Sequence, residues 1–191
     1  MQIHELLDRL ELISPNNTFF TDLRKTILNN DQFALFRLLQ QQTSSQLVEG
    51  LRKYKDNTEF NADCFSRGQL ESKLWLVKEL QKTKVDLGTV FLCAGWYATL
   101  ATMLFESSIT VDKIRSFDID DTCRDIAETF NKPWVKDNWK FKSSTKDIMD
   151  INYEFERYEV IRADGTTCPL DDTPDTIINT SCEHIENFEE W

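Results

Sequence analysis

The sequence predicts an α/β protein whose sheet is mostly parallel and doubly wound, an arrangement of the Rossmann-like type. Two segments lead to this prediction, because each joins a short apolar strand to a helix through a polar turn. Residues 89–94 are continuously apolar and run through a glycine turn into an apolar helix over 98–107. Residues 113–117 form a second strand, which ends in Asp118 and leads to a helix over 122–130. Strand and helix alternate in this way in sheets that are buried on both faces.

The remaining elements extend this pattern along the chain. A helix over 66–82 precedes the first strand and begins with a Ser-x-x-Gln capping box. A third strand is expected near 139–142, and a fourth, apolar strand over 176–179. Between them, residues 153–168 alternate between apolar and polar, which predicts an inserted β-hairpin.

The N-terminal third consists of short helical patterns without recognisable chemistry. Apolar residues recur at helical spacing, and polar runs such as 14–17 interrupt them. We therefore expect an N-terminal helical cap over 1–60 and one Rossmann-like domain over 61–191.

Composition argues against several classes of protein. Hydrophobic residues make up 40% of the chain and charged residues 29%, as in an ordinary soluble domain. No apolar run approaches the roughly 20 residues that a membrane-spanning helix needs. The five cysteines lie far apart without Cys-x-x-Cys spacing, which argues against a zinc site and a disulfide framework. These features predict a cytoplasmic protein without a bound metal.

Charge is distributed unevenly along the chain. The formal net charge of −11 disfavours nucleic acid as a partner of the chain as a whole. Residues 132–146 reverse this balance, with five lysines, one aspartate and three aromatic residues. Such a run can contact an anionic partner, but more often it is a solvated edge whose aromatic side chains turn inward.

The ends of the first two strands carry the residue types that a nucleoside cofactor needs. Gly95 follows the first strand, where a small residue lets the backbone approach a ligand. Asp118 ends the second strand, where a carboxylate can bind ribose hydroxyls. Each has a simpler explanation alone, as a turn glycine or a helix-capping aspartate. Their separation of 23 residues, in this strand order, favours a ligand site.

From about residue 66 to its end, the chain resembles class I S-adenosylmethionine-dependent methyltransferases, in particular a small group found in phage-like genomes. The stretches that carry the resemblance are SRGQLESKLWL, FLCAGWYATLA, SFDIDDTCRDIAETF and IINTSCEHIENFEEW. The resemblance implies that the chain binds S-adenosylmethionine and transfers its methyl group to an acceptor that these motifs do not identify. It also implies a location in the host cytoplasm if the chain is phage-encoded.

The resemblance assigns a cofactor role to residues that follow the first three strands. The loop after the first strand would comprise Cys93, Ala94, Gly95, Trp96 and Tyr97. Asp118 would bind the ribose, with Asp120 as a close rival and Ile119 between them, and Asp147 and Ile148 would flank the adenine.

Residues after the fourth strand would lie beside the transferred methyl group. These are Asn179, Glu183 and His184. Methyl transfer depends mainly on positioning, and a general base is optional. Glu183 or His184 would be that base, unless the pair only starts a helix.

The loop departs from the family pattern of an acid and several glycines. Gly95 is followed by Trp96 and Tyr97, which would obstruct the tight approach of a pyrophosphate. S-adenosylmethionine has no phosphates, and aromatic faces attract its positive sulfonium. We therefore expect S-adenosylmethionine rather than NAD. The fourth motif is not Asn-Pro-Pro-Tyr, so it does not indicate a DNA base as acceptor.

The helix over 66–82 begins near the expected pocket. Its free N–H groups, together with Arg67 and Lys73, would bind the methionine carboxylate. The alternative is a capped surface helix whose arginine is solvated.

The family fold continues beyond a fourth strand, so we expect this domain to be C-terminally incomplete and catalytically silent. An open strand over 176–179 would then pair with a second copy or a partner chain. The alternative is a non-catalytic cofactor-binding or interaction module that retains the fold.

Overall fold

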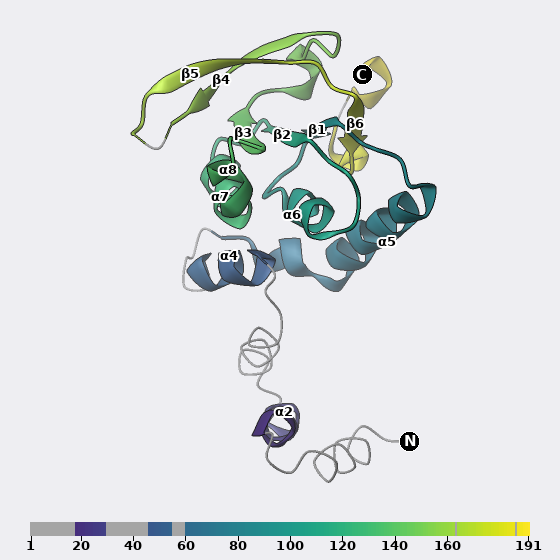
Figure 1. The fold of residues 1–191 in the computed structure, drawn as a ribbon, viewed down its shortest axis with the longest axis vertical. Helices are drawn as coiled ribbons and strands as arrows, with labels where there is room; N and C mark the ends of the chain where they lie inside the picture. Colours follow the sequence, from purple (N-terminus) through teal and green to yellow (C-terminus); the bar gives the residue numbers. More distant parts are fainter. Residues whose placement is uncertain (1–17, 30–45, 55–59, 163, 186) are drawn as a thin grey trace. The chain divides into compact units, whose positions relative to one another are not determined.

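The computed structural model describes residues 18–29, 46–54, 60–162, 164–185 and 187–191 (Figure 1). The chain divides into two compact units, Met1–Val48 and Glu49–Trp191, and each is described by itself. The first unit contains helix α2 (Thr18–Leu28), and helix α4 (Gln46–Tyr54) crosses the division. The expected cap over 1–60 lies largely outside the described residues and stays a prediction.

A four-stranded, fully parallel sheet forms the centre of the second unit, in the order β3-β2-β1-β6. Its strands are β1 (Thr89–Cys93), β2 (Lys113–Asp118), β3 (Phe141–Thr145) and β6 (Thr176–Asn179). The mixed α/β class and the parallel, Rossmann-like sheet agree with the prediction. The third strand begins at Phe141 rather than near 139, because Asn138 and Trp139 have positive φ angles of 48° and 53° and belong to the preceding turn.

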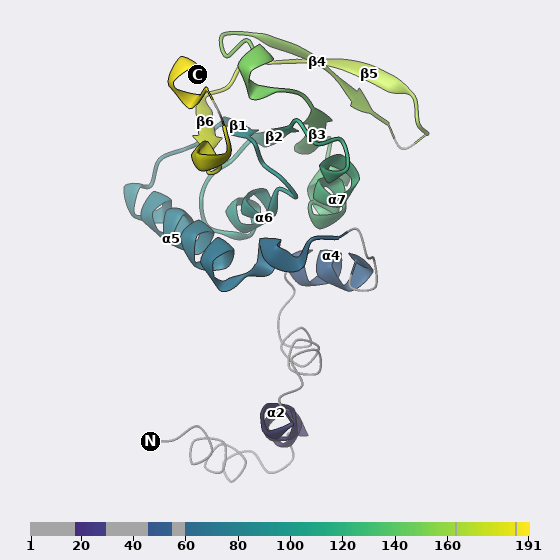
Figure 2. The same cartoon turned by 180° about the vertical axis from the view of Figure 1, so that it is seen from behind.

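Four helices lie on one face of this sheet, which Figures 1 and 2 show from opposite sides. They are α5 (Arg67–Thr83), α6 (Thr99–Glu106), α7 (Cys123–Phe130) and α8 (Lys132–Lys136). Helix α5 begins where the capping box predicts, because Ser66 Oγ accepts a 3.5 Å hydrogen bond from the Gln69 amide. The short 3₁₀ helices are η1 (Ala62–Phe65), η2 (Ile148–Asp150), η3 (Cys182–His184) and η4 (Phe188–Glu190).

A two-stranded antiparallel ribbon, rather than a second layer of helices, covers the other face of the sheet in the described part of the chain (Figures 1 and 2). Its strands are β4 (Glu156–Ile161) and β5 (Thr167–Asp172). A doubly wound sheet carries helices on both faces, whereas in the described residues the antiparallel ribbon takes the place of the second helical layer. The reason lies in the sequence of β4, whose buried and exposed residues alternate with the period of a strand.

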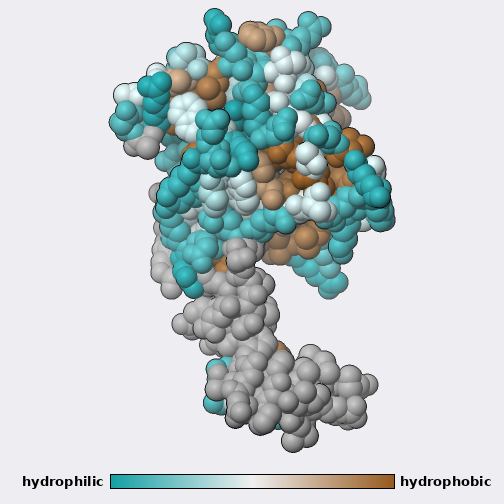
Figure 3. All heavy atoms as spheres, in the orientation of Figure 1, coloured by the Kyte–Doolittle hydropathy of each residue, from teal (hydrophilic) through white to brown (hydrophobic). Residues whose placement is uncertain are grey.

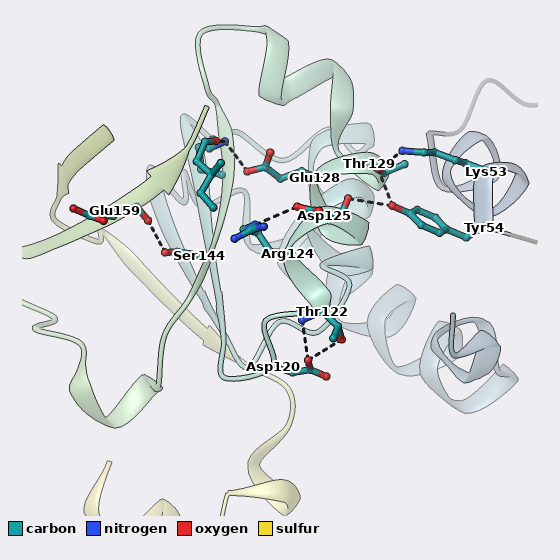
Figure 4. Close-up of polar contacts among 12 residues, drawn as sticks. Lys53, Tyr54, Asp120, Thr122, Arg124, Asp125, Glu128, Thr129, Ser144 and Glu159 are labelled. Atoms are coloured by element: carbon teal, nitrogen blue, oxygen red, sulfur yellow. Dashed lines mark hydrogen bonds and ion pairs between the residues drawn. The ribbon is translucent and has the colours of Figure 1, made fainter. Parts of the chain in front are cut away.

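Side chains of β3 hold the ribbon by its backbone. Ser144 Oγ donates a 2.8 Å hydrogen bond to the Glu159 carbonyl oxygen (Figure 4), and Lys142 Nζ donates one of 3.0 Å to the Ile161 carbonyl oxygen. The ribbon is therefore bound to side chains on the face of β3, and its strands form no backbone hydrogen-bond ladder with the parallel sheet.

Aromatic residues fill the core on both sides of the sheet. On the ribbon side, the Phe117 ring lies edge to face with Phe91 and Tyr158, with centroids 5.1 and 5.3 Å apart. On the helical side, Phe130 of α7 is fully buried, and a Cβ at Gly50 would lie only 1.8 Å from its ring. Gly50 therefore lets α4 approach α7.

Some apolar surface stays exposed around α5. Figure 3 shows brown surface over the α5–α6 side of one face. Large apolar side chains exposed to solvent include Leu74 and Trp75 of α5, Val85 after it, and Ile177 of β6.

Among the described helices, none has the length and apolarity to cross a membrane.

Candidate functional site

A pocket of about 600 Å³ lies at the carboxyl ends of the strands. The loop after β1 and the segment after β6 both line it, and these two strands are neighbours although the chain visits β2 and β3 between them. The pocket therefore lies at the topological switch point of the sheet, where α/β proteins bind ligands. Its size is in the range of ligand sites, roughly 300–1,000 Å³.

The loop after β1 has an unusual backbone. Ala94, Trp96 and Ala98 have φ angles of 50°, 50° and 49°, although none of them is glycine. Positive φ is strained for residues with a Cβ, and such strain persists only where the surroundings fix it. Here β2 fixes the loop: the Gly95 amide donates to the Phe117 carbonyl oxygen at 3.1 Å, and the Trp96 amide to Asp118 Oδ2 at 2.7 Å.

Gly95 lines the pocket. Packing within the protein, and not only space for a ligand, requires a glycine at this position. A Cβ at this position would lie 2.2 Å from Ser116 Oγ on β2. That hydroxyl is buried and has no hydrogen-bond partner among the described atoms. The absent side chain therefore lets the loop pack directly on the neighbouring strand.

Asp118 forms part of the pocket wall at the end of β2. Its two carboxylate oxygens accept hydrogen bonds from the backbone amides of Trp96 (2.7 Å) and Asp120 (3.1 Å). Burial raises the pKa of this carboxyl, and the amide donors act in the opposite direction. A carboxylate oxygen can accept more than one hydrogen bond, so Asp118 keeps acceptor capacity for a ligand hydroxyl.

Asp120 has a different role from Asp118 in the structure. It lies outside the pocket lining, and its Oδ1 accepts hydrogen bonds from the amide and hydroxyl of Thr122 at 2.9 and 2.7 Å (Figure 4). These hydrogen bonds lower the pKa of Asp120. Asp120 shapes the turn into α7, so the structure favours Asp118 as the acid that faces a ligand.

Two exposed apolar side chains flank the pocket beside Asp118. Ile119 is 71% exposed and Met149 38% exposed, and both line the pocket. Asp147 and Ile148 also line it; Asp147 Oδ1 accepts a 2.9 Å hydrogen bond from the Met149 amide and so starts η2. The sequence identified Ile119, Asp147 and Ile148 but missed Met149.

The beginning of α5 contributes Lys73 but not Arg67. Lys73 lines the pocket, contacts Gln69 Oε1, and has its pKa lowered by burial. The Arg67 side chain is 87% exposed, pairs with Glu71 at 2.7 Å, and lies outside the pocket lining. The expectation that both cations serve the pocket is therefore wrong for Arg67. Asp63 of η1, which the sequence did not indicate, lines the pocket as well.

Three further expected residues do not line the pocket. Cys93 is fully buried, with Sγ 3.5 Å from the Tyr153 hydroxyl, and burial raises the pKa of its thiol to about 11. Tyr97 is buried, and its hydroxyl accepts a 3.3 Å hydrogen bond from the Asn61 amide. Asn179 Oδ1 accepts from the Ser181 amide at 2.9 Å. Among these contacts, that of the Asn179 side chain is with a residue of the pocket lining, Ser181.

The segment after β6 brings Glu183 and His184 to the pocket. Glu183 Oε1 lies 3.6 Å from His184 Nε2, and both side chains are mostly exposed. Ser181 also lines the pocket, and its hydroxyl donates a 3.2 Å hydrogen bond to the Ala94 carbonyl oxygen. This contact joins the loops that follow β6 and β1.

The charged lining of the pocket is mainly acidic. Its carboxylates are Asp63, Asp118, Asp147 and Glu183, whereas its basic residues are Lys73 and His184. In the part of the chain that the structure describes, no three His, Cys, Asp or Glu side chains are grouped so as to hold a metal ion. The chemistry of this lining suits a polar organic ligand that carries positive charge.

Comparisons with protein-family models, with curated proteins and with solved structures find no match to this chain.

Proposed function

We propose that the pocket binds S-adenosylmethionine and that the chain acts in methyl transfer to an acceptor still to be identified. The observation that carries this proposal is the position of Asp118. Its carboxylate lies in the pocket wall at the end of β2, beside the switch point of the sheet. In this position a carboxylate is suited to the ribose hydroxyls of a nucleoside.

The pocket lining supports S-adenosylmethionine over a cofactor with phosphates. Four carboxylates and one lysine would repel a pyrophosphate but attract the sulfonium and amino groups of S-adenosylmethionine. Ile119 and Met149 offer apolar contact for a flat adenine, beside Asp147. S-adenosylmethionine supplies a methyl group on a positively charged sulfur, and the chain contributes the position of that group.

Calorimetric titration with S-adenosylmethionine, S-adenosylhomocysteine, NAD and ATP tests this proposal. We expect the first two to bind, and Ile119→Ala to weaken both. Val85→Ala is the matched control, since Val85 is also an exposed apolar residue but does not line the pocket. Binding of NAD or ATP without S-adenosylmethionine would overturn the proposal.

A second candidate is that the chain binds S-adenosylmethionine without turnover. The observation that favours it is the exposure of Glu183 and His184, whose side chains lie 3.6 Å apart and are 67% and 75% exposed. A general base is normally held in place by the groups around it. A methyl-transfer assay on a mixture of candidate acceptors, with Glu183→Gln and His184→Gln compared with the unaltered chain, separates the two candidates.

A further inference from the structure

A second cleft, of about 410 Å³, lies at the β3 side of the sheet. Helices α7 and α8 form one wall with Arg124, Glu128 and Lys136, and the end of the ribbon forms another with Ile161 and Arg162. It shares no lining residue with the first pocket. Segments far apart in the sequence therefore build a separate cavity.

The lining of this cleft reverses the charge of the chain. Four of its residues are cations and two are carboxylates, in a chain whose formal net charge is −11. Such a local reversal produces a field that draws anions to the cleft although the chain as a whole repels them.

Lys142 forms a buried base of the cleft. Its side chain is 2% exposed, and Nζ lies 2.6 Å from Glu128 Oε1 and donates to the Ile161 carbonyl oxygen. The same ammonium group lies 5.4 Å from the centre of the Trp139 ring. Lys142 therefore neutralises Glu128 and fixes the positions of both walls and of Trp139.

The remaining cations are available at the rim. Lys136 and Arg162 are exposed, and neither forms an ion pair with another described residue. Arg124 forms an ion pair with the adjacent Asp125 at 3.1 Å (Figure 4); the arginine side chain is 28% exposed and the aspartate 81%, so water reaches the pair from the aspartate side and weakens it. Asp164, at the tip of the ribbon, accepts hydrogen bonds from the Thr166 amide and hydroxyl; these bonds lower its pKa, and the charge of Arg162 adds to the effect without a direct ion pair.

We propose that this cleft binds a phosphate-bearing ligand, with the phosphate on Lys136, Arg162 and Arg124 and a nucleobase against Trp139. Arginine and lysine are the side chains that bind phosphate, and an aromatic ring stacks on any base. Val135 and Ile161 add apolar wall, and the cavity has the size of a single-nucleotide site. The ligand is either a free nucleotide or one nucleotide of a single strand.

Two probes distinguish these sources in the full chain. Uridine 5′-monophosphate is titrated by calorimetry, and fluorescein-labelled hexauridylate by fluorescence anisotropy. We expect at least one to bind, with an affinity that falls as salt is raised. Binding of both shows that a mononucleotide is sufficient, and binding of the hexamer alone assigns the cleft to a strand.

Lys136→Glu and Lys132→Glu form a matched pair on α8. Both lysines are exposed, but only Lys136 lines the cleft. We expect Lys136→Glu and Arg162→Glu each to weaken binding about tenfold, since a charge-assisted contact to phosphate is replaced by repulsion. Lys132→Glu should change it by less than about twofold.

Three results would overturn the proposal: no binding of either probe, equal weakening by Lys132→Glu and Lys136→Glu, or displacement of hexauridylate by hexaglutamate at equal concentration. The last result would mean that the cleft attracts any polyanion. Failure of S-adenosylmethionine to bind would leave this proposal intact, because the two pockets share no residue.

Discussion

Arg115 of β2 and Asp172 of β5 form a buried ion pair between the sheet and the ribbon, with Nε and Oδ2 2.8 Å apart. The side chains are 6% and 2% exposed. Lys113 and the Tyr158 hydroxyl contact the same carboxylate, and Arg115 also donates a 2.7 Å hydrogen bond to the Trp139 carbonyl oxygen. A buried pair with satisfied hydrogen bonds is costly to break, because the remaining charge cannot be solvated.

Asp172→Asn should destabilise the protein by about 3–5 kcal/mol, since Arg115 would stay buried and charged without its partner. Urea unfolding followed by circular dichroism measures the loss. Asp171→Asn is the control on the adjacent residue, because Asp171 pairs with Arg157 on the surface and should matter little. Equal effects of the two substitutions would contradict a special role for the buried pair.

The same carboxylate makes stability depend on pH. Burial tends to raise the pKa of Asp172, but hydrogen bonds from Lys113 and Tyr158 and the charge of Arg115 outweigh it and hold the pKa below its ordinary value. Its stabilisation is therefore complete above the unfolded-state pKa of about 4 and is lost as pH falls through the lower folded-state value. Urea midpoints of the unaltered chain and Asp172→Asn should converge below about pH 4. A difference that stays constant down to pH 2 would refute this assignment.

Gly95→Ala should destabilise the protein by about 1–3 kcal/mol, because its methyl group would meet Ser116 Oγ. Ser116→Ala should cost little, since it removes a buried hydroxyl without a partner among the described atoms. The double variant should then recover most of the loss, as thermal unfolding would show. If Gly95→Ala costs the same in both backgrounds, Ser116 is not the obstacle.

Asp118→Ala should weaken binding of S-adenosylhomocysteine about ten- to a hundredfold, through lost charge-assisted hydrogen bonds to the ribose. Asp120→Ala should leave the affinity unchanged, because Asp120 lies outside the pocket lining. Calorimetry measures both. Asp118→Asn, whose Oδ1 can still accept from the Trp96 amide, controls for loosening of the loop. Loss of affinity in Asp120→Ala alone would mean that Asp120, and not Asp118, binds the ribose.

Self-association along β6 is the fifth prediction. β6 is an edge strand of the described sheet, with Ile177 exposed in its centre, and exposed edges pair with other chains. Sedimentation velocity over a range of concentrations should show association, and Ile177→Lys should reduce it. Val85→Lys, which changes an exposed apolar residue outside the strands, should not. A monomer at all concentrations would rule the interaction out.

The order of strands and helices could be predicted because β1 and β2 are nearly fully buried and leave an unbroken apolar signal in the sequence. The direction of a side chain at the start of a helix could not be predicted from the sequence. The capping box showed where α5 begins, yet it did not reveal that Arg67 turns to Glu71 and away from the pocket.

The second cleft shows a different limit. The lysine and aromatic residues of 132–146 were visible as a run, but Arg124 and Arg162 join them only because the ribbon folds back over β3. Local patterns do not encode such a long-range contact. Met149 was missed for a related reason, since exposure of an apolar residue at a pocket depends on tertiary structure.

The attachment of the ribbon through carbonyl oxygens affects how the protein can evolve. Ser144 and Lys142 hold positions 159 and 161 by backbone atoms that every residue possesses. Substitution of the exposed Glu159 side chain therefore leaves its anchoring hydrogen bond in place. Residues on the outer surface of the ribbon can therefore change, and so contact new partners, while the hydrogen bonds that attach its backbone to β3 are kept.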